Sequence, residues 1–158
     1  MPGTGFADLL VADGVIIDMA VAGKDALLRA LCTAAADALD LPASLVLERV
    51  RTREALGSTG FGHGAAIPHA RIEGLARCAV LLARLHAPID YGALDGDPVD
   101  VVVLLLSPED AGADHLKALA RISRTLRDPA VMAQLRAAES VAALQGAIAG
   151  AAQAQQAA

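Results

Sequence analysis

The stretch that decides the fold is Val99-Asp100-Val101-Val102-Val103-Leu104-Leu105-Leu106, a nearly continuous run of β-branched residues and leucine. A half-exposed strand alternates apolar and polar residues, whereas an unbroken apolar run is typical of a strand that is covered on both faces. We therefore predict a buried strand here, which Ser107-Pro108 ends. A second strand is predicted over Cys78–Leu85, and Val15–Met19 could form a short third one.

Helical patterns lie on both sides of these strands. Leucine and alanine recur at spacings of three and four over residues 24–39, and residues 43–55 form a second candidate helix with Glu54 facing outward. Further helices are predicted over residues 112–127, 128–135 and 139–149, the first of them with an apolar face of Leu116, Leu119, Ile122 and Leu126. This order of elements favours an α/β fold, a mixed β-sheet flanked by helices.

Length and composition limit the class of protein. The 158 residues suit a single domain, and we assign residues 1–10 to an N-terminal arm, 11–149 to the domain and 150–158 to a flexible tail. The aperiodic Gly- and Ala-rich pattern that indicates a loose arm extends to residue 14. A net charge of -5 and only three aromatic residues disfavour a nucleic-acid partner.

Cellular location is inferred from apolar runs, the N-terminus and the cysteines. Apolar runs are far shorter than the ~20 residues of a membrane span, and acidic Asp8 and Asp13 without a basic region argue against a signal peptide. We expect a cytoplasmic protein that does not insert into the membrane. Cys32 and Cys78 sit in apolar patterns, so we expect two buried free thiols.

Candidate chemistry gathers in the glycine-rich segment Gly57-Ser58-Thr59-Gly60-Phe61-Gly62-His63-Gly64-Ala65-Ala66-Ile67-Pro68-His69. Pro68 restricts the backbone before His69, which holds the imidazole beside glycine amides. A neutral imidazole is a nucleophile, and amides stabilise added negative charge, so His69 is a candidate phosphorylated histidine. Gly62, Gly64 and Ser58 are candidate phosphoryl-binding residues. The alternative is a turn histidine without a role.

The other histidines allow several interpretations. His115 falls in the first turn of a predicted helix, where it could face an anion or be a half-buried structural residue. His63 would share a face with His69 if the segment were extended, and His86 beside Pro88 is interpreted as a surface residue. We expect no metal, because no cysteine or carboxylate recurs at ligand spacing, and no cofactor.

Known motifs of other enzyme classes are absent from the sequence. The glycines are followed neither by Gly-Lys-Ser/Thr nor by a helix, which argues against a P-loop and a dinucleotide fingerprint, and there is no Gly-x-Ser-x-Gly. Arg51 and Arg53 end the preceding helix. Either they complement the helix dipole, or a guanidinium reaches a phosphate on His69.

The segment from Arg53 to Arg71 resembles the active-site segment of the type-2 enzyme IIA domains of the bacterial phosphotransferase system, the fructose/mannitol superfamily. The similarity is greatest to the nitrogen-regulatory branch. It continues through Pro88-Ile89, the segment 95–100, the apolar strand and His115-Leu116-x-x-Leu119-x-x-Ile122, and spans roughly residues 8–148. The resemblance implies a single α/β domain.

The resemblance also implies roles for site residues. His69 matches the phosphorylated histidine, His115 the second active-site histidine that orients or stabilises the phosphoryl group, and Arg53 the arginine that neutralises phosphate charge. His63 departs from the pattern, since the family often carries Asn, Glu or another polar residue there. The implied phosphoryl donor is the carrier protein HPr or its nitrogen-branch paralogue.

Three functions remain open. A nitrogen-regulatory protein would bind targets, such as a sensor kinase or a potassium-transport component, according to its phosphorylation state. A sugar-specific fructose/mannitol-type protein would pass the phosphate to a separate IIB. An interaction module independent of phosphate is disfavoured by the presence of His69, His115 and Arg53 together.

Overall fold

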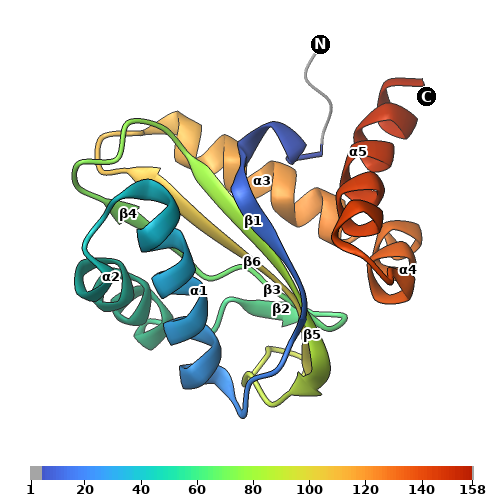
Figure 1. Ribbon diagram of the computed structural model, residues 1–158, viewed down its shortest axis with the longest axis horizontal. Helices are drawn as coiled ribbons and strands as arrows, with labels where there is room; N and C mark the ends of the chain where they lie inside the picture. Colours follow the sequence, from blue (N-terminus) through green and yellow to red (C-terminus); the bar gives the residue numbers. More distant parts are fainter. Residues whose placement is uncertain (1–4, 158) are drawn as a thin grey trace.

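Within the described part of the chain, residues 5–157, six strands form one mixed sheet between two layers of helices (Figure 1). This architecture, taken from a computed structural model, confirms the predicted α/β fold. The strands are β1 (Leu10–Met19), β2 (Gly60–Gly62), β3 (Ala65–Ala66), β4 (His69–Ile72), β5 (Ala79–Ile89) and β6 (Val99–Pro108). The helices are the 3-10 turn η1 (Ala7–Leu9), α1 (Lys24–Leu39), α2 (Ala43–Ala55), α3 (Ala113–Leu126), α4 (Pro129–Ala137) and α5 (Val141–Ala157).

Strand β6 is the centre of the sheet. It pairs antiparallel with β5 on one side, while β3 and β4 both run parallel to it along the other side. Strand β1 lies outside β5 in parallel, and β2 pairs antiparallel with β3. Because β3 and β4 share one edge of β6, the break between them at Ile67-Pro68 decides where His69 enters the sheet.

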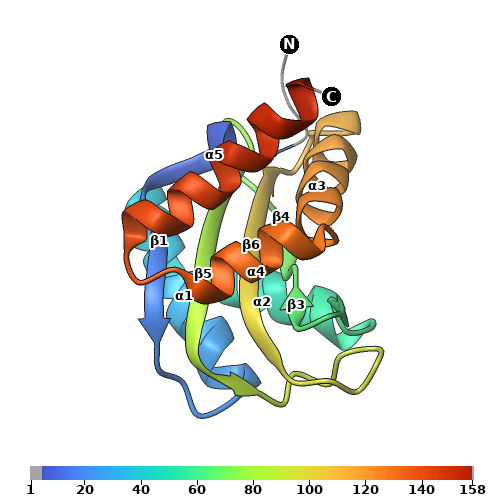
Figure 2. The same ribbon diagram turned by 90° about the vertical axis from the view of Figure 1, so that its right-hand side faces the viewer.

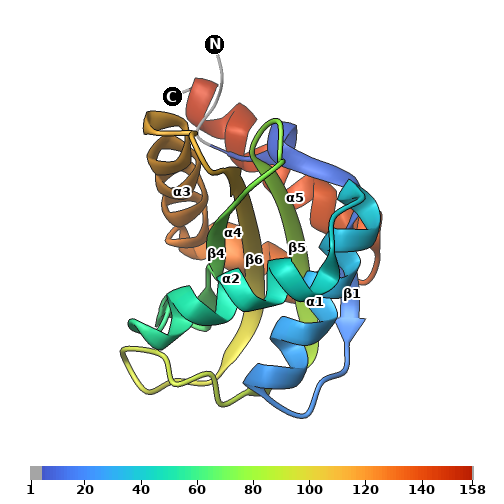
Figure 3. The same cartoon turned by 90° about the vertical axis from the view of Figure 1, so that its left-hand side faces the viewer.

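The two faces of β6 are both buried, as its sequence predicts. Val101, Val103 and Leu105 belong to the core under α3, α4 and α5, which cover the face seen in Figure 2. Val102, Leu104 and Leu106 belong to the core under α1 and α2, which cover the face seen in Figure 3. Successive side chains of a strand point to opposite faces, so an unbroken apolar run supplies both cores at once.

Near both ends of the described part of the chain, regular secondary structure extends further than the sequence predicts. Strand β1 begins at Leu10, preceded by η1, and Phe6 is fully buried in the core under α3, α4 and α5. The prediction of a loose arm through residue 14 is therefore wrong for residues 5–14, and residues 1–4 lie outside the described residues. Helix α5 continues to Ala157, past the predicted end at residue 149.

Ile122 and Leu126 of the apolar face predicted for α3 are buried and Leu119 is half-buried, as predicted, but the first turn differs. Leu116 is 64% exposed, whereas His115 is buried together with Ala118 and Ile122. Residues at spacings of three and four share a helix face, so a buried position at 118 and 122 places position 115 inward. The prediction for Leu116 is wrong, and the first turn of the helix directs His115 toward the core instead.

Both cysteines are free thiols, as predicted. Cys32 is buried, as predicted, and burial raises the pKa of its thiol to about 12. The prediction of a buried thiol is wrong for Cys78, which is only half-buried. None of the helices among the described residues is long and apolar enough to cross a membrane.

Candidate active site

Strand β4 presents His69 and Arg71 on the same face. Alternation along the strand buries Ala70 and Ile72, while His69 and Arg71 stay half-buried. The carbonyl of Pro68 accepts a hydrogen bond of 3.0 Å from the amide of Leu105, so the sheet holds the backbone up to the first residue of β4. This anchoring limits the freedom of the His69 backbone, in agreement with the effect expected of the preceding proline.

The hydrogen bond of the His69 ring determines which of its nitrogens is free. Nδ1 lies 2.8 Å from the carbonyl oxygen of Ile67. Because a carbonyl oxygen only accepts, Nδ1 carries the proton, and in the neutral ring the lone pair is then on Nε2. Burial lowers the pKa of His69 below its ordinary value, more than the Ile67 carbonyl raises it, and the positive charge of Arg53 lowers it further. The His69 ring is therefore neutral at neutral pH, with its lone pair on Nε2.

The structure brings His115 next to His69. The ring centroids are 5.4 Å apart and the rings are inclined by 51°. Nδ1 of His115 lies 2.7 Å from the hydroxyl oxygen of Ser107, which is fully buried near the end of β6. Burial, followed by the charges of Arg71 and His69, lowers the pKa of His115 to about 4. Both imidazoles are thus neutral at the pH of most cells.

Two arginines supply positive charge to this pair of histidines. Arg53, in the last turn of α2, donates a hydrogen bond of 2.8 Å to the carbonyl of Gly57 and lowers the pKa of His69 through its charge. Arg71 acts in the same way on His115. In the part of the chain that the structure describes, neither guanidinium belongs to an ion pair. Both are available to an anion on His69.

A buried network holds the C-terminal end of α2 beside the site. The Glu54 carboxylate accepts hydrogen bonds from the hydroxyls of Thr59 and Tyr91, the latter at 2.8 Å, and pairs with Lys24 at 2.9 Å. Burial raises the pKa of Glu54, but these partners outweigh it and hold the pKa below its ordinary value. The prediction that Glu54 faces outward is wrong. Its charge is compensated inside the protein, directly after Arg53 in the chain.

The glycine-rich segment folds as a hairpin rather than an extended segment. His63 lies in the turn between β2 and β3 in the left-handed region (φ 58°) and is exposed, and its amide donates to Asp95. The expectation that His63 shares a face with His69 is therefore wrong. A Cβ on Gly62 would approach Asp95, and one on Gly64 would collide with Arg136 and Asp100.

The geometry thus gives these two glycines a packing role away from the histidine pair. Gly62 lies against Asp95, and Gly64 lies against Arg136 and Asp100, with its carbonyl accepting from the amides of Asp100 and Val101. Ser58 accepts a hydrogen bond of 3.1 Å from the Gly60 amide, which stabilises the loop after α2. Binding of a phosphoryl group by Gly62, Gly64 or Ser58 stays a prediction.

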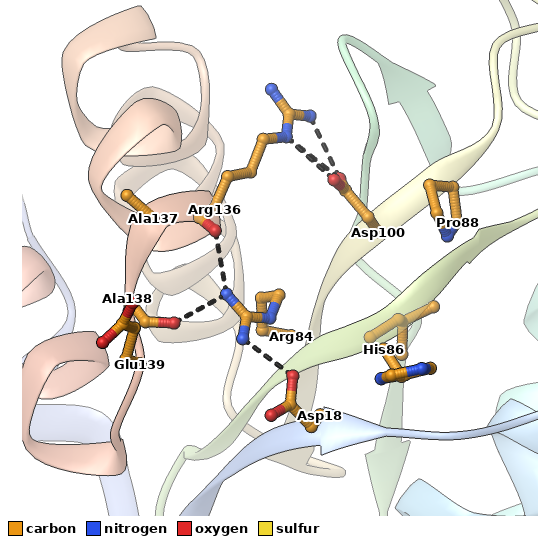
Figure 4. A pocket seen from close by; sticks show the side chains of 10 residues that line it. Asp18, Arg84, His86, Pro88, Asp100, Arg136, Ala137, Ala138 and Glu139 are labelled. Atoms are coloured by element: carbon orange, nitrogen blue, oxygen red, sulfur yellow. Dashed lines mark hydrogen bonds and ion pairs between the residues drawn. The ribbon is translucent and has the colours of Figure 1, made fainter.

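His86 lies in a separate polar pocket of about 420 Å³ (Figure 4). Figure 4 shows both of its arginines paired, with Arg84 directed at Asp18 and Arg136 at Asp100. His86 is exposed, as predicted, and has no contact with the histidine pair. In the described portion of the chain, no three His, Cys, Asp or Glu side chains gather in a way that could hold a metal ion.

Arg71 and Ser107 were missed as site residues by sequence reasoning. For Arg71 a signal existed, since a residue two positions after His69 shares its face in a strand. For Ser107 there was none, because it was interpreted only as the end of the apolar strand. The two residues are register partners in the β4–β6 pairing, so the sheet brings them together.

Comparison with known proteins places these features in a family. The family model described as "Phosphoenolpyruvate-dependent sugar phosphotransferase system, EIIA 2" matches residues 8–150. A protein named "Nitrogen regulatory protein" from Bradyrhizobium diazoefficiens is 44% identical over 137 residues, which are 87% of this chain and 90% of that protein. A protein of the same name from Escherichia coli is 41% identical over 107 residues, which are 67% and 66% of the two chains.

Solved structures agree with the sequence comparisons. The nitrogen regulatory protein IIA-Ntr from Neisseria meningitidis superposes with a TM-score of 0.85 at 29% identity, covering 90% of this chain and 98% of that one. The mannitol IIA from Escherichia coli superposes with a TM-score of 0.71 at 17% identity, over 86% and 96% of the two chains, which shows the shared fold. The chain belongs to the EIIA type-2 family of the phosphoenolpyruvate-dependent phosphotransferase system, and it is similar to that family's nitrogen regulatory members.

Proposed function

We propose that this protein accepts a phosphoryl group on Nε2 of His69 and regulates partner proteins according to its phosphorylation state. The phosphoryl donor would be phosphorylated HPr or its nitrogen-branch paralogue. The observation that carries the proposal is the hydrogen bond from Nδ1 of His69 to the Ile67 carbonyl, 2.8 Å long, with the neutral His115 ring 5.4 Å away. This arrangement leaves one nucleophilic nitrogen, Nε2, on a half-buried ring.

The transfer balances without a proton leaving either protein. The lone pair of His69 Nε2 forms the new N–P bond while the N–P bond of the donor histidine breaks, and the donor ring leaves with that electron pair as a neutral imidazole. The phosphorylated His69 ring then keeps its proton on Nδ1 and carries positive charge, which the Ile67 carbonyl stabilises through the existing hydrogen bond.

Arg53 and Arg71 would compensate the charge of the transferring phosphoryl group. Phosphoryl transfer depends mainly on positioning and on electrostatic stabilisation of the oxygens of that group. Both guanidiniums lie close enough to lower the pKa of one histidine of the pair, Arg53 that of His69 and Arg71 that of His115. The same repulsion that keeps the rings unprotonated therefore becomes attraction once a phosphoryl dianion is bound.

Intact-mass measurement after incubation with phosphoenolpyruvate, enzyme I and HPr tests this proposal. The wild-type protein is expected to gain the mass of one phosphoryl group, and His69→Ala none. His86→Ala is the matched control, since His86 is an exposed histidine in another pocket and its loss should leave the uptake unchanged. An equal mass increase in His69→Ala and wild type would sink the assignment.

A sugar-specific role is the second candidate, because a relative named "PTS system fructose-specific EIIABC component" from Bacillus subtilis is 39% identical over 93 residues. The two roles differ in where the phosphoryl group goes next. A purified fructose-type IIB should stay unphosphorylated when it is mixed with the phosphorylated protein. Instead, a target from the cell extract should bind wild type and His69→Ala differently after phosphorylation. Rapid loss of the phosphoryl group to the IIB cysteine would favour the sugar-specific role.

A further inference from the structure

We propose that Ser107 is a positioning residue for His115. Its buried hydroxyl donates a hydrogen bond to Nδ1 of His115, so that His115 carries its proton on Nε2 and presents an N–H donor to the phosphoryl group on His69. The role in phosphoryl transfer rests on the proposed function. The tautomer assigned to His115 is a property of the unphosphorylated protein and is measured there.

The geometry places Ser107 directly behind His115. Ser107 is fully buried, and its Oγ lies 2.7 Å from Nδ1 of His115, a short distance for this kind of hydrogen bond. The pairing of Ser107 with Arg71 in the β4–β6 register fixes its backbone, and α3 delivers His115 from the opposite side. The sheet and the helix therefore lock this contact from both partners.

The direction of the hydrogen bond follows from what else the Ser107 hydroxyl contacts. Within the described residues, its other hydrogen-bond partner is the Cys78 thiol, whose sulfur lies 3.5 Å away. If Nδ1 of His115 donated to Ser107, the serine hydrogen would have only this sulfur as acceptor, and thiols are weak acceptors. If Ser107 donates to Nδ1, its hydrogen has a strong nitrogen acceptor, and the Cys78 S–H can donate to Ser107 or to the Asp114 carbonyl, 4.0 Å away.

The two neutral histidines are then opposite tautomers. His69 has its proton on Nδ1, held by the Ile67 carbonyl, and a free lone pair on Nε2. His115 has its proton on Nε2 and its lone pair on Nδ1, held by Ser107. One ring is prepared to attack phosphorus and the other to donate a hydrogen bond to a phosphoryl oxygen. Because burial holds the pKa of His115 at about 4, it donates as a neutral group.

Nitrogen-15 NMR of the histidine rings tests the proposal in the unphosphorylated wild-type protein at neutral pH. We expect His115 to show a protonated Nε2 and an unprotonated Nδ1, and His69 the reverse. A wild-type His115 with its proton on Nδ1 would overturn the proposal, whatever any variant does. If the wild type took up no phosphoryl group from HPr, that result would count against the proposed function. It would not change the tautomer of His115 that NMR measures.

Variants then test whether the contact matters for transfer. In Ser107→Ala, the neutral His115 ring should populate both tautomers, and the rate of phosphoryl uptake should fall about two- to tenfold, the effect of one lost hydrogen bond between neutral groups. Ser107→Thr keeps the hydroxyl, so it should restore the single tautomer of His115 and most of the rate of phosphoryl uptake.

Thr125→Val is the matched control, because it removes another buried hydroxyl, one that bonds the Arg121 carbonyl on α3. It should leave the ring of His115 and the rate unchanged. If Thr125→Val lowers the rate as much as Ser107→Ala does, Ser107 has a structural role only, and the proposal is wrong.

Discussion

Replacing Glu54 by glutamine is expected to lower the free energy of unfolding by about 2–4 kcal/mol. Glu54 is 9% exposed, and its carboxylate contacts Lys24 at 2.9 Å, the Tyr91 hydroxyl at 2.8 Å and the Thr59 hydroxyl. Glutamine keeps the shape but removes the charge, and its amide hydrogens meet other donors. Lys24 is 30% exposed in its side chain and can turn to water, so the loss stays below that of a fully buried pair.

The effect of Glu54→Gln on the free energy of unfolding should also depend on pH. The pKa of Glu54 in the folded protein lies below its ordinary value of 4.5. A carboxyl with a lowered pKa stabilises the protein fully above the unfolded pKa, and this contribution disappears as the pH falls through the folded pKa. The difference in unfolding free energy between wild type and Glu54→Gln should therefore be constant above about pH 5 and shrink on further acidification.

Urea unfolding measures both effects. The chain has one tyrosine and no tryptophan, so its ultraviolet fluorescence reports the surroundings of Tyr91, and circular dichroism follows the helices. Tyr91→Phe is the matched control and is followed by circular dichroism, because it removes the tyrosine. It deletes the hydroxyl that donates to Glu54 at 2.8 Å and lies 3.1 Å from the Thr59 hydroxyl, and should cost about 1–2 kcal/mol. The reasoning is refuted if Glu54→Gln costs under about 1 kcal/mol at neutral pH, or if its cost does not exceed that of Tyr91→Phe.

Three further substitutions test other parts of the structure. Phe6→Ala should lower the free energy of unfolding by about 3 kcal/mol or more in urea titration, because Phe6 is fully buried. A loss under ~1 kcal/mol would instead support the prediction of a loose N-terminal arm. Gly64→Ala should cost about 1–3 kcal/mol, since Gly64 has φ +80° and an added Cβ collides with Arg136 and Asp100; an unchanged urea midpoint would contradict this. In His115→Gln the free energy of unfolding should fall less steeply than in wild type between about pH 6.5 and 4. The pKa of His115 is lowered to about 4 in the folded protein, so the unfolded chain takes up the proton first. An equal dependence of the unfolding free energy on pH in wild type and variant would contradict this.

Much of the fold could be read from local patterns. The predicted helices over residues 24–39 and 43–55 agree with α1 and α2, and the apolar run at 99–106 is the central strand β6. These elements were accessible because hydrophobic periodicity and the residues at their ends act within a few positions along the chain. The short strands β2, β3 and β4 were not, because they are held by pairing with distant partners rather than by their own composition.

The amino-acid sequence by itself determined that His69 follows a proline at the end of a glycine-rich segment, and that His115 stands in the first turn of a helix. Only the tertiary structure decided that the two rings lie 5.4 Å apart, that Glu54 is buried, and that Ser107 lies behind His115. Such contacts join residues that are far apart in sequence. They depend on the register between β4 and β6 and on the orientation of α3 about its axis, which buries His115 and leaves Leu116 exposed. No local pattern carries that information, because it is set by how the layers pack against one another.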